Sequence, residues 1–197
     1  MKIAIVILAA GNSRRFGKNK LLYPVDGVPM YQRTLQTFGS IKTQYHPQKK
    51  SDYEISDFFV VTRFETVKKE CGVYGAVPVH NDEPEKGISH SLVLGLKKAQ
   101  KADACLFAVC DQPWLTAKSV IRLLEHYVSS GKGIGCMASE GVYGNPCIFS
   151  KKYYPELLAL TGDKGGKRVL MAHQEDLTVY EASNRKELSD VDVPPME

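Results

Sequence analysis

The sequence predicts an α/β domain with a mostly parallel central sheet and helices on both of its faces. Continuous apolar runs rich in β-branched residues are typical of strands buried on both faces of a parallel sheet. They lie at residues 3–8, 58–62, 76–80 and 104–109, with a weaker fifth run at 134–138. Stretches with helical spacing alternate with them, at residues 31–41, 65–71, 91–101 and 117–128, the last with Thr116 as its expected N-cap. This alternation predicts right-handed crossovers and a ligand site beyond the carboxyl ends of the strands.

The final third of the chain departs from this alternation. Segment 143–149 is short and contains glycine and proline, after which we expect helices at 152–160 and 166–173 and a late strand at 177–180. Segment 42–57 is polar and lacks periodicity, so we expect a surface loop there. The length of 197 residues predicts one domain, residues 1–197.

The composition excludes several classes of protein. With 43% hydrophobic and 24% charged residues, the chain is typical of a globular protein rather than a disordered one. The net charge of +4 comes from Lys and Arg spread along the chain, which argues against a nucleic-acid partner. No apolar stretch has the length of a membrane span. Five cysteines without CxxC spacing argue against a zinc site and favour a reducing cytoplasm.

The glycine-rich loop after the first apolar run carries the strongest chemical signal. Segment 8–11 reads Leu-Ala-Ala-Gly, and Arg15 and Lys20 follow it. Small residues let the backbone approach a ligand, successive N–H groups can hold an anion, and basic side chains add charge for phosphates. Gly11 and Gly17 are too far apart for a Rossmann fingerprint, and no Walker A pattern is present. A surface loop with solvated basic residues is the alternative.

Asp111 gives a second signal, because it follows an apolar run expected at the centre of the sheet. A carboxylate at that strand end faces the site built by the first loop. Hard oxygen ligands beside phosphates suit Mg²⁺. The alternative is an aspartate that caps a turn.

Segment 81–91 gives a third signal, with Asn81 and Gly87 ahead of Ser89 and Ser91 at the start of an expected helix. The two serines can bind a base edge, although helix capping is the commoner reason for serine at such positions.

Three later segments complete the set. Residues 144–146 and the glycine-dense residues 162–168 can receive an anion where a helix begins. Asp190 and Asp192 are two residues apart and so point to the same side of an extended segment, with an acidic tail as the alternative.

Together these residues resemble the molybdenum cofactor cytidylyltransferase family, which has a Rossmann-like nucleotidyltransferase domain with a glycosyltransferase-A-like fold. The family pattern LAAGxSxRxGxxKLL matches residues 8–22 at every fixed position. Further family elements match residues 87–91, 111–113, 144–146, 162–168 and 190–194, in the family's order. Segment 42–57 is longer than usual, and Val193 replaces the usual threonine, which leaves the second metal ligand open.

The resemblance implies Mg²⁺-dependent transfer of CMP from CTP to the phosphate of molybdopterin, with release of pyrophosphate. The implied catalytic residues are Arg15, Lys20 and Asp111. The implied nucleotide-binding residues are Leu8, Ala9, Ala10, Gly11, Ser13, Arg15, Lys20, Asn81, Gly87, Ser89 and Ser91. The implied acceptor-binding residues are Gly144, Asn145, Pro146, Gly162, Asp163, Gly165 and Arg168. The implied ligands of Mg²⁺ are Asp111 and Asp192, with Asp190 in reserve.

The base and the acceptor stay open at this point. Guanylyl-transferring relatives usually carry glycine where this chain has Ala10, and a methyl group changes how closely a purine can approach, so Ala10 favours cytidine. The alternatives are guanylyl transfer, a sugar-phosphate or alditol-phosphate acceptor, and a non-catalytic nucleotide-binding accessory protein of a molybdenum hydroxylase. We expect a cytoplasmic protein that contacts such a hydroxylase transiently and binds neither nucleic acid nor membrane.

Overall fold

The computed structural model describes residues 1–11, 16, 19–44 and 52–191, with the backbone alone at 42–44. Within these residues the main sheet has seven strands in the order β5-β4-β1-β6-β8-β7-β9. Its strands are β1 (Lys2–Ala9), β4 (Glu54–Thr62), β5 (Val77–His80), β6 (Ala104–Val109), β7 (Ile134–Ser139), β8 (Val142–Ser150) and β9 (Leu177–Glu181). The strands β2 (Pro24–Val25) and β3 (Val28–Pro29) form a separate hairpin. None of the described helices is long and apolar enough to cross a membrane.

Pairing in the main sheet is mostly parallel, as predicted. β5, β4, β1 and β6 are successive parallel neighbours, and β7 pairs parallel with β9. β8 pairs antiparallel with both β6 and β7, so it runs against the other strands of this sheet. Leu8 of β1 is in register with Val109 of β6. The loop after β1 and the loop that carries Asp111 therefore leave the sheet side by side at one edge.

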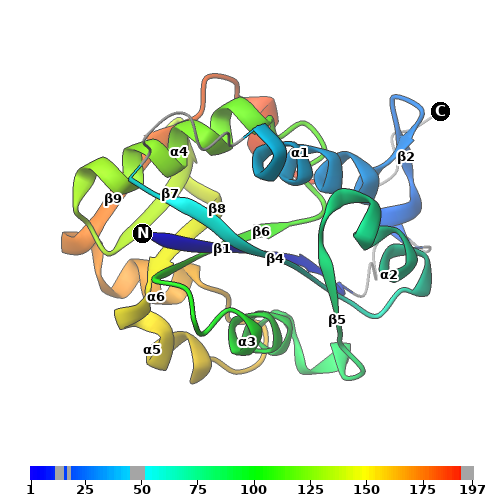
Figure 1. Cartoon of the computed structure of the whole chain (residues 1–197), viewed down its shortest axis with the longest axis horizontal. Helices are drawn as coiled ribbons and strands as arrows, with labels where there is room; N and C mark the ends of the chain where they lie inside the picture. Colours follow the sequence, from blue (N-terminus) through cyan, green and yellow to red (C-terminus); the bar gives the residue numbers. More distant parts are fainter. Residues whose placement is uncertain (12–15, 17–18, 45–51, 192–197) are drawn as a thin grey trace.

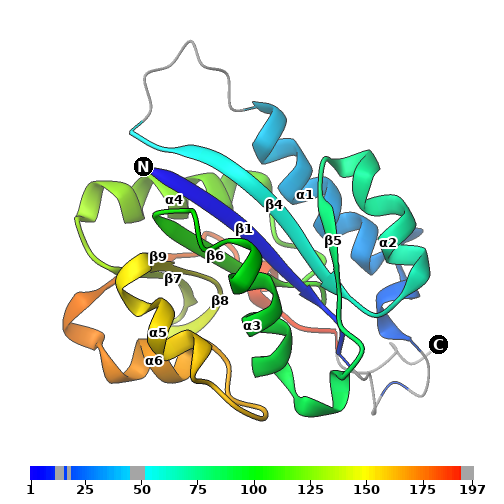
Figure 2. The ribbon, with the colours of Figure 1, turned by 60° about the horizontal axis from the view of Figure 1, so that its bottom comes forward.

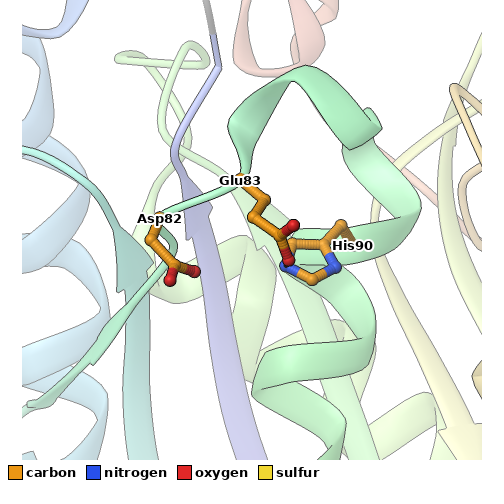
Figure 3. A group of neighbouring side chains, drawn as sticks. All are labelled: Asp82, Glu83 and His90. Atoms are coloured by element: carbon orange, nitrogen blue, oxygen red, sulfur yellow. The ribbon is translucent and has the colours of Figure 1, made fainter.

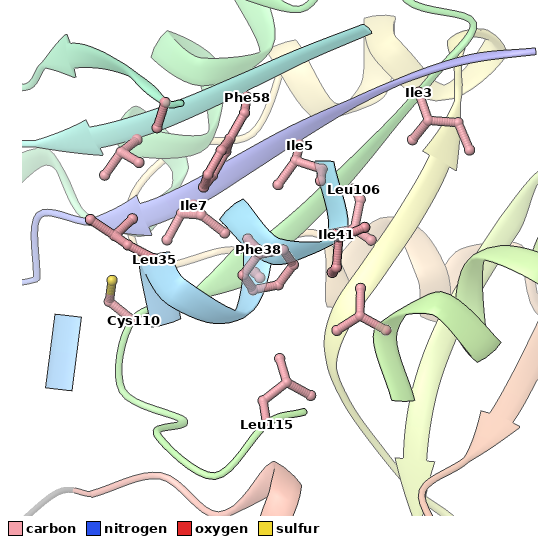
Figure 4. Packing of buried hydrophobic residues seen from close by; sticks show 14 of the residues in the cluster. Ile3, Ile5, Ile7, Leu35, Phe38, Ile41, Phe58, Leu106, Cys110 and Leu115 are labelled. Carbon is pink, nitrogen blue, oxygen red and sulfur yellow. The ribbon is translucent and has the colours of Figure 1, made fainter. Parts of the chain in front are cut away.

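Helices cover both faces of the sheet (Figures 1 and 2). The helices are α1 (Met30–Gln44), α2 (Glu65–Cys71), α3 (Ile88–Lys98), α4 (Ala117–Ser130), α5 (Tyr154–Leu158) and α6 (Lys167–Ala172). One core cluster joins Ile5 and Ile7 of β1 to Phe38 of α1, as Figure 4 shows. The other joins Val6 of β1 to Leu96 of α3. Because successive strand residues point to opposite faces, one apolar strand supplies both cores.

Most expected elements are confirmed, and one expectation was wrong. The segment 42–57 is not a loop throughout, because α1 continues to Gln44 and β4 begins at Glu54, with Tyr53 buried in front of it. The polar start of β4 is held by pairing with β1, where Lys2 is in register with Glu54. Residues 45–51 lie outside the described part of the chain.

The weak fifth run is strand β7, as expected, and segment 143–149 belongs to β8, which pairs with β7 as an antiparallel hairpin. Thr116 caps α4 as expected, because its side chain accepts a hydrogen bond from the Ser119 amide at 3.2 Å.

Candidate active site

A cavity of about 490 Å³ lies at the carboxyl ends of β1 and β6. Its lining includes many of the residues expected to bind a nucleotide: Leu8, Ala9, Ala10, Gly11, Lys20, Gly87 and Ser91. Asp111, expected as a catalytic residue and metal ligand, also lines it. The sequence reasoning did not name Phe16, Leu21, Pro84, Glu85, Ile88, Val109 and Cys110, which also line it. Ser13 and Arg15 lie outside the described residues.

Lys20 and Asp111 form an ion pair on one side of this first cavity. The Nζ atom of Lys20 donates to Oδ2 of Asp111 at 2.7 Å, and the two side chains are 14% and 24% exposed. Lys20 begins a short 3₁₀ helix (Lys20–Leu22), which the side chain of Asn19 caps. A parallel pair of strands thus brings together a cation and a carboxylate that are 91 residues apart in the chain.

The second oxygen of Asp111 has the properties of a metal ligand. Oδ1 is buried and has no hydrogen-bond partner within the described residues. A buried carboxylate oxygen without a partner is uncommon in proteins. Mg²⁺ prefers anionic oxygen ligands, so the donor present at this position fits the ion that the sequence predicts.

Side chains of α1 hold the loop that carries Asp111. Arg33 Nε donates to the carbonyl oxygen of Pro113 at 3.1 Å, and Thr37 Oγ1 donates to that of Leu115 at 3.1 Å. Their spacing of four residues on one helix places them on one side of it. The sequence reasoning missed these residues, because only the packing of α1 against the loop gives them a role.

The 81–91 loop supplies another wall, and two of its predicted ligand-binding residues do not line the cavity. Asn81 is fully buried behind Ser91, and its Nδ2 donates to Ser91 Oγ at 2.9 Å. Ser89 is also buried, and its amide donates to the carbonyl oxygen of Gly162 at 3.2 Å. Ser91 does line the cavity. Asn81 and Ser89 therefore shape the loop, because the side chain of Asn81 and the backbone amide of Ser89 are bound within the protein.

Gly87 permits a close approach between two loops. Its φ is +85°, and a Cβ atom there would overlap the carbonyl oxygen of Gly162 and lie 2.6 Å from Oδ1 of Asp163. This contact holds the 162–168 segment against the start of α3. It also places Asp163, expected in the acceptor site, on the lining of the first cavity.

A second cavity, of about 470 Å³, includes Gln112, the neighbour of Asp111, in its lining. It is lined by Gln112, Ser139, Glu140, Val142, Tyr143, Gly144, Asn145, Cys147, Lys167, Leu170, Arg185, Leu188, Ser189 and Asp190. The reversed strand β8 explains its position, because the start of β8 lies near the carboxyl end of its antiparallel neighbour β7.

The predicted acceptor residues are thus divided. Gly144 and Asn145 line the second cavity. Pro146, Gly162, Gly165 and Arg168 line neither of the two cavities. Arg168 is exposed, and its neighbour Lys167 lines the second cavity instead. Consecutive residues of a helix point about 100° apart, so these two side chains cannot both face that cavity.

The C-terminal segment contacts the Asp111 loop directly. The amide of Val191 donates to the carbonyl oxygen of Asp111 at 3.0 Å, and Val191 packs in a small apolar cluster with Phe16. Asp190 lines the second cavity rather than the first. Its place does not support the reserve role as a metal ligand beside Asp111. Asp192 lies outside the described residues.

A group of potential metal ligands on the far side of the 81–91 loop does not join the cavity. Oxygen and nitrogen atoms of Asp82, Glu83 and His90 lie within 4.8 Å of one another, and Figure 3 shows Glu83 beside the His90 ring. Glu83 already pairs with Lys86 at 2.5 Å and with His90 at 3.7 Å. Glu83 is thus already engaged by two basic side chains.

The cysteines take no part in the chemistry of the cavities. All five are free and buried. Burial raises the pKa of the Cys110 thiol, beside the first cavity, well above its ordinary value. Since the thiolate is the reactive form, this residue is a poor nucleophile.

The comparisons with known proteins agree with this geometry. Residues 5–177 match the family model described as the MobA-like NTP transferase domain. The chain is similar to the purine catabolism protein PucB of Bacillus subtilis, with 31% identity over 96% of this chain and 91% of that protein. It is 27% identical to a molybdenum cofactor guanylyltransferase of Histophilus somni, over 74% of this chain and 67% of that one. A nucleotidyl transferase structure from Methanothermobacter superposes with a TM-score of 0.77 at 23% identity, over 97% and 92% of the two chains.

Proposed function

Since the chain belongs to the MobA-like NTP transferase family, a family of nucleotidyltransferases, we propose that it transfers CMP from CTP to the phosphate of molybdopterin. The observation that carries the proposal is the pair of cavities that the Asp111 loop lines. Asp111 lines the first cavity and its neighbour Gln112 lines the second, so a nucleotide and an acceptor would bind against neighbouring residues of one loop.

The first cavity suits the nucleotide. Ala10 is nearly buried in its wall, and its methyl group limits the approach of a large base. Glu85 lies on the same lining. A carboxylate accepts hydrogen bonds from the exocyclic amino group of cytosine, which supports cytidine as the base.

Lys20 and Asp111 suit the triphosphate end. Mg²⁺, held by Asp111 and Asp192, would neutralise charge on the phosphates. Lys20 is close enough to that carboxylate to bind phosphate oxygens beside it, and a fixed ammonium stabilises charge that develops in the transition state. We also propose Arg15, which the resemblance implies, as a second cation for this end.

The reaction needs no nucleophile from the protein. An oxygen of the acceptor phosphate attacks the α-phosphorus of CTP and forms the new P–O bond. The bond from that phosphorus to the bridging oxygen breaks, and pyrophosphate leaves with the electron pair. The protein's contribution is positioning and electrostatic stabilisation.

The second cavity suits an anionic acceptor. Lys167 and Arg185 lie on its lining and Asn145 offers an amide. Arg185 pairs with Glu140 of the same lining at 3.3 Å, so an anionic acceptor would compete with that carboxylate for the guanidinium. Lys167 donates to the carbonyl oxygen of Tyr143 at 3.3 Å, which directs its side chain along this wall. The free, buried cysteines are consistent with a reducing compartment, and we propose a cytoplasmic location.

Guanylyl transfer is the second candidate function. The Histophilus somni relative is named for that activity, and the carboxylate of Glu85 can also accept from the two N–H groups on one edge of guanine. The name of PucB connects that relative with purine catabolism, so an accessory role in such a pathway is the non-enzymatic alternative.

A nucleotide screen followed by an assay tests the proposal. Thermal unfolding is measured with Mg²⁺ and each of CTP, GTP, ATP and UTP, and pyrophosphate release is then measured with molybdopterin. A ligand at about 100 times its Kd stabilises the protein by about 2.7 kcal/mol, which raises the Tm by roughly 5–10 °C. We expect the largest shift with CTP, and pyrophosphate release that Asp111→Asn abolishes.

A larger shift with GTP, together with GTP-dependent pyrophosphate release, would replace cytidylyl by guanylyl transfer. A nucleotide shift without pyrophosphate release from molybdopterin would refute transfer to that acceptor and favour the accessory role.

A further inference from the structure

Gln112 lines the second cavity, follows Asp111 of the first, and binds the C-terminal segment. The residue is 5% exposed. The Nε2 atom donates to the carbonyl oxygen of Leu188 at 3.2 Å and to Oδ1 of Asp190 at 3.0 Å. Both N–H bonds of the amide are therefore directed to one short stretch of chain, 76 and 78 residues away.

The orientation of this amide follows from its partners. Both partners are acceptors, so the nitrogen must face them and Oε1 must point the other way. Oε1 is buried and has no hydrogen-bond partner within the described residues. Leaving a buried acceptor unsatisfied is unfavourable, and a leucine would fill the space without that penalty. The amide is thus poorly explained by packing alone.

Two further contacts tie the same segment to the loop on either side of Gln112. On one side, the amide of Val191 donates to the carbonyl oxygen of Asp111 at 3.0 Å. On the other, buried Glu187 accepts hydrogen bonds from the Thr116 amide at 3.2 Å and from its hydroxyl at 2.9 Å. Gln112 lies between these two anchors, and its neighbour Asp111 carries the carboxylate of the first cavity.

We propose that Gln112 is a positioning residue that locks segment 187–191 against the Asp111 loop. The lock sets the Asp111 carboxylate at the first cavity and the Asp190 carboxylate at the second in one fixed relation. An amide is suited to this task, because a glutamate would repel Asp190 and a lysine would neutralise it. The effect on turnover rests on the proposed function, whereas the effect on the segment does not.

Amide hydrogen exchange tests the lock without any substrate. The variant Gln112→Leu keeps the volume but removes both donors. We expect exchange in the peptide that covers 187–191 to become about 10- to 100-fold faster, as expected for a lost bond to a charged group. The matched control is Gln174→Leu, because Gln174 is exposed and its side chain donates to the carbonyl oxygen of nearby Met171 at 3.3 Å. Unchanged exchange in Gln112→Leu would overturn the proposal.

A reciprocal pair of variants tests the functional part. In Gln112→Glu two carboxylates face each other, and we expect kcat to fall about 10- to 100-fold while KM for the nucleotide changes much less. Adding Asp190→Asn restores one donor–acceptor pair in reverse, because the amide introduced at position 190 can donate to the new carboxylate. We expect the double variant to be more active than Gln112→Glu, a pattern that a general loss of stability would not produce, because a second substitution would only add to such a loss.

Failure of this inference is distinguishable from failure of the proposed function. If the double variant is no more active than Gln112→Glu, the positioning role is wrong although the enzyme works. If the wild-type protein turns over no nucleotide, the proposed function is wrong, and the exchange experiment alone decides whether Gln112 holds the segment.

Discussion

Replacing Lys20 with methionine removes an ammonium but keeps a side chain of similar length. In the wild-type protein this ammonium lies 2.7 Å from Oδ2 of Asp111. The variant leaves the carboxylate without that donor, and its other oxygen, Oδ1, is already buried without a partner within the described residues. The variant therefore retains an uncompensated negative charge at the rim of the first cavity.

The size of the effect follows from the exposure of the pair. Exposed ion pairs contribute about 0–1 kcal/mol, whereas breaking a fully buried pair costs about 3–5 kcal/mol. Lys20 and Asp111 are 14% and 24% exposed and lie between these limits. We expect the free energy of unfolding to fall by about 2 kcal/mol, which lowers the Tm by roughly 4–8 °C for a chain of this length.

The assay is thermal unfolding with and without Mg²⁺. In the wild-type protein the ammonium competes with the metal for Asp111, so Mg²⁺ alone should raise the Tm little. In Lys20→Met the ion can take the place of the ammonium, so saturating Mg²⁺ should restore most of the lost stability. Lys98→Met, at an exposed lysine of α3, is the control. Equal Tm values for Lys20→Met and the wild type, or equal responses to Mg²⁺, would refute this account of the site.

Two further predictions concern a loop contact and a carboxylate. Gly87→Ala should lower stability by about 1–3 kcal/mol and abolish the nucleotide-induced rise in Tm, since its Cβ would overlap the Gly162 carbonyl oxygen. Gly131→Ala is the control, because Gly131 also has a positive φ but a Cβ atom there would have nothing within 4 Å. An equal loss of stability and of the nucleotide-induced rise in Tm in both variants would exclude the contact with Gly162 as the cause. The net pKa of the Asp176 carboxyl is lowered from 3.8 to about 2. Burial alone would raise this pKa, but hydrogen bonds, chiefly from Lys152, lower it by more. The lowered pKa contributes stability above pH 3.8, and this stability is lost as the pH falls toward 2. The Tm of the wild-type protein should therefore exceed that of Asp176→Asn by less and less over this range. A Tm difference that does not depend on pH would contradict this prediction.

Local sequence was sufficient for elements with a clear apolar pattern. The strand predicted at 104–109 and the helix predicted at 65–71 have those bounds in the structure. A strand in the middle of a sheet that helices cover on both faces must be apolar throughout, and a helix at the surface buries one stripe, so the composition of each reveals it. The beginning of β4 gave no such signal, because backbone pairing with β1 holds it whatever its side chains.

The candidate site could be predicted only at the level of which strand ends meet. Lys20 and Asp111 both follow parallel neighbours, so their convergence on one edge was predictable. The direction of each side chain was not. Asn81 and Ser89 belong to the expected segment, yet their polar groups are bound within the protein, because the loop is shaped by its contact with Gly162.

By itself the sequence determined the fold class, the family and the edge of the sheet at which the site lies. Each follows from a short stretch of chain, in which apolar periodicity and loop composition are local properties. Only the tertiary structure decided that the site is divided into two cavities and that Gln112 ties Asp190 to the Asp111 loop. These features depend on the reversed strand β8 and on contacts between residues 76 and 78 positions apart, which no local spacing encodes.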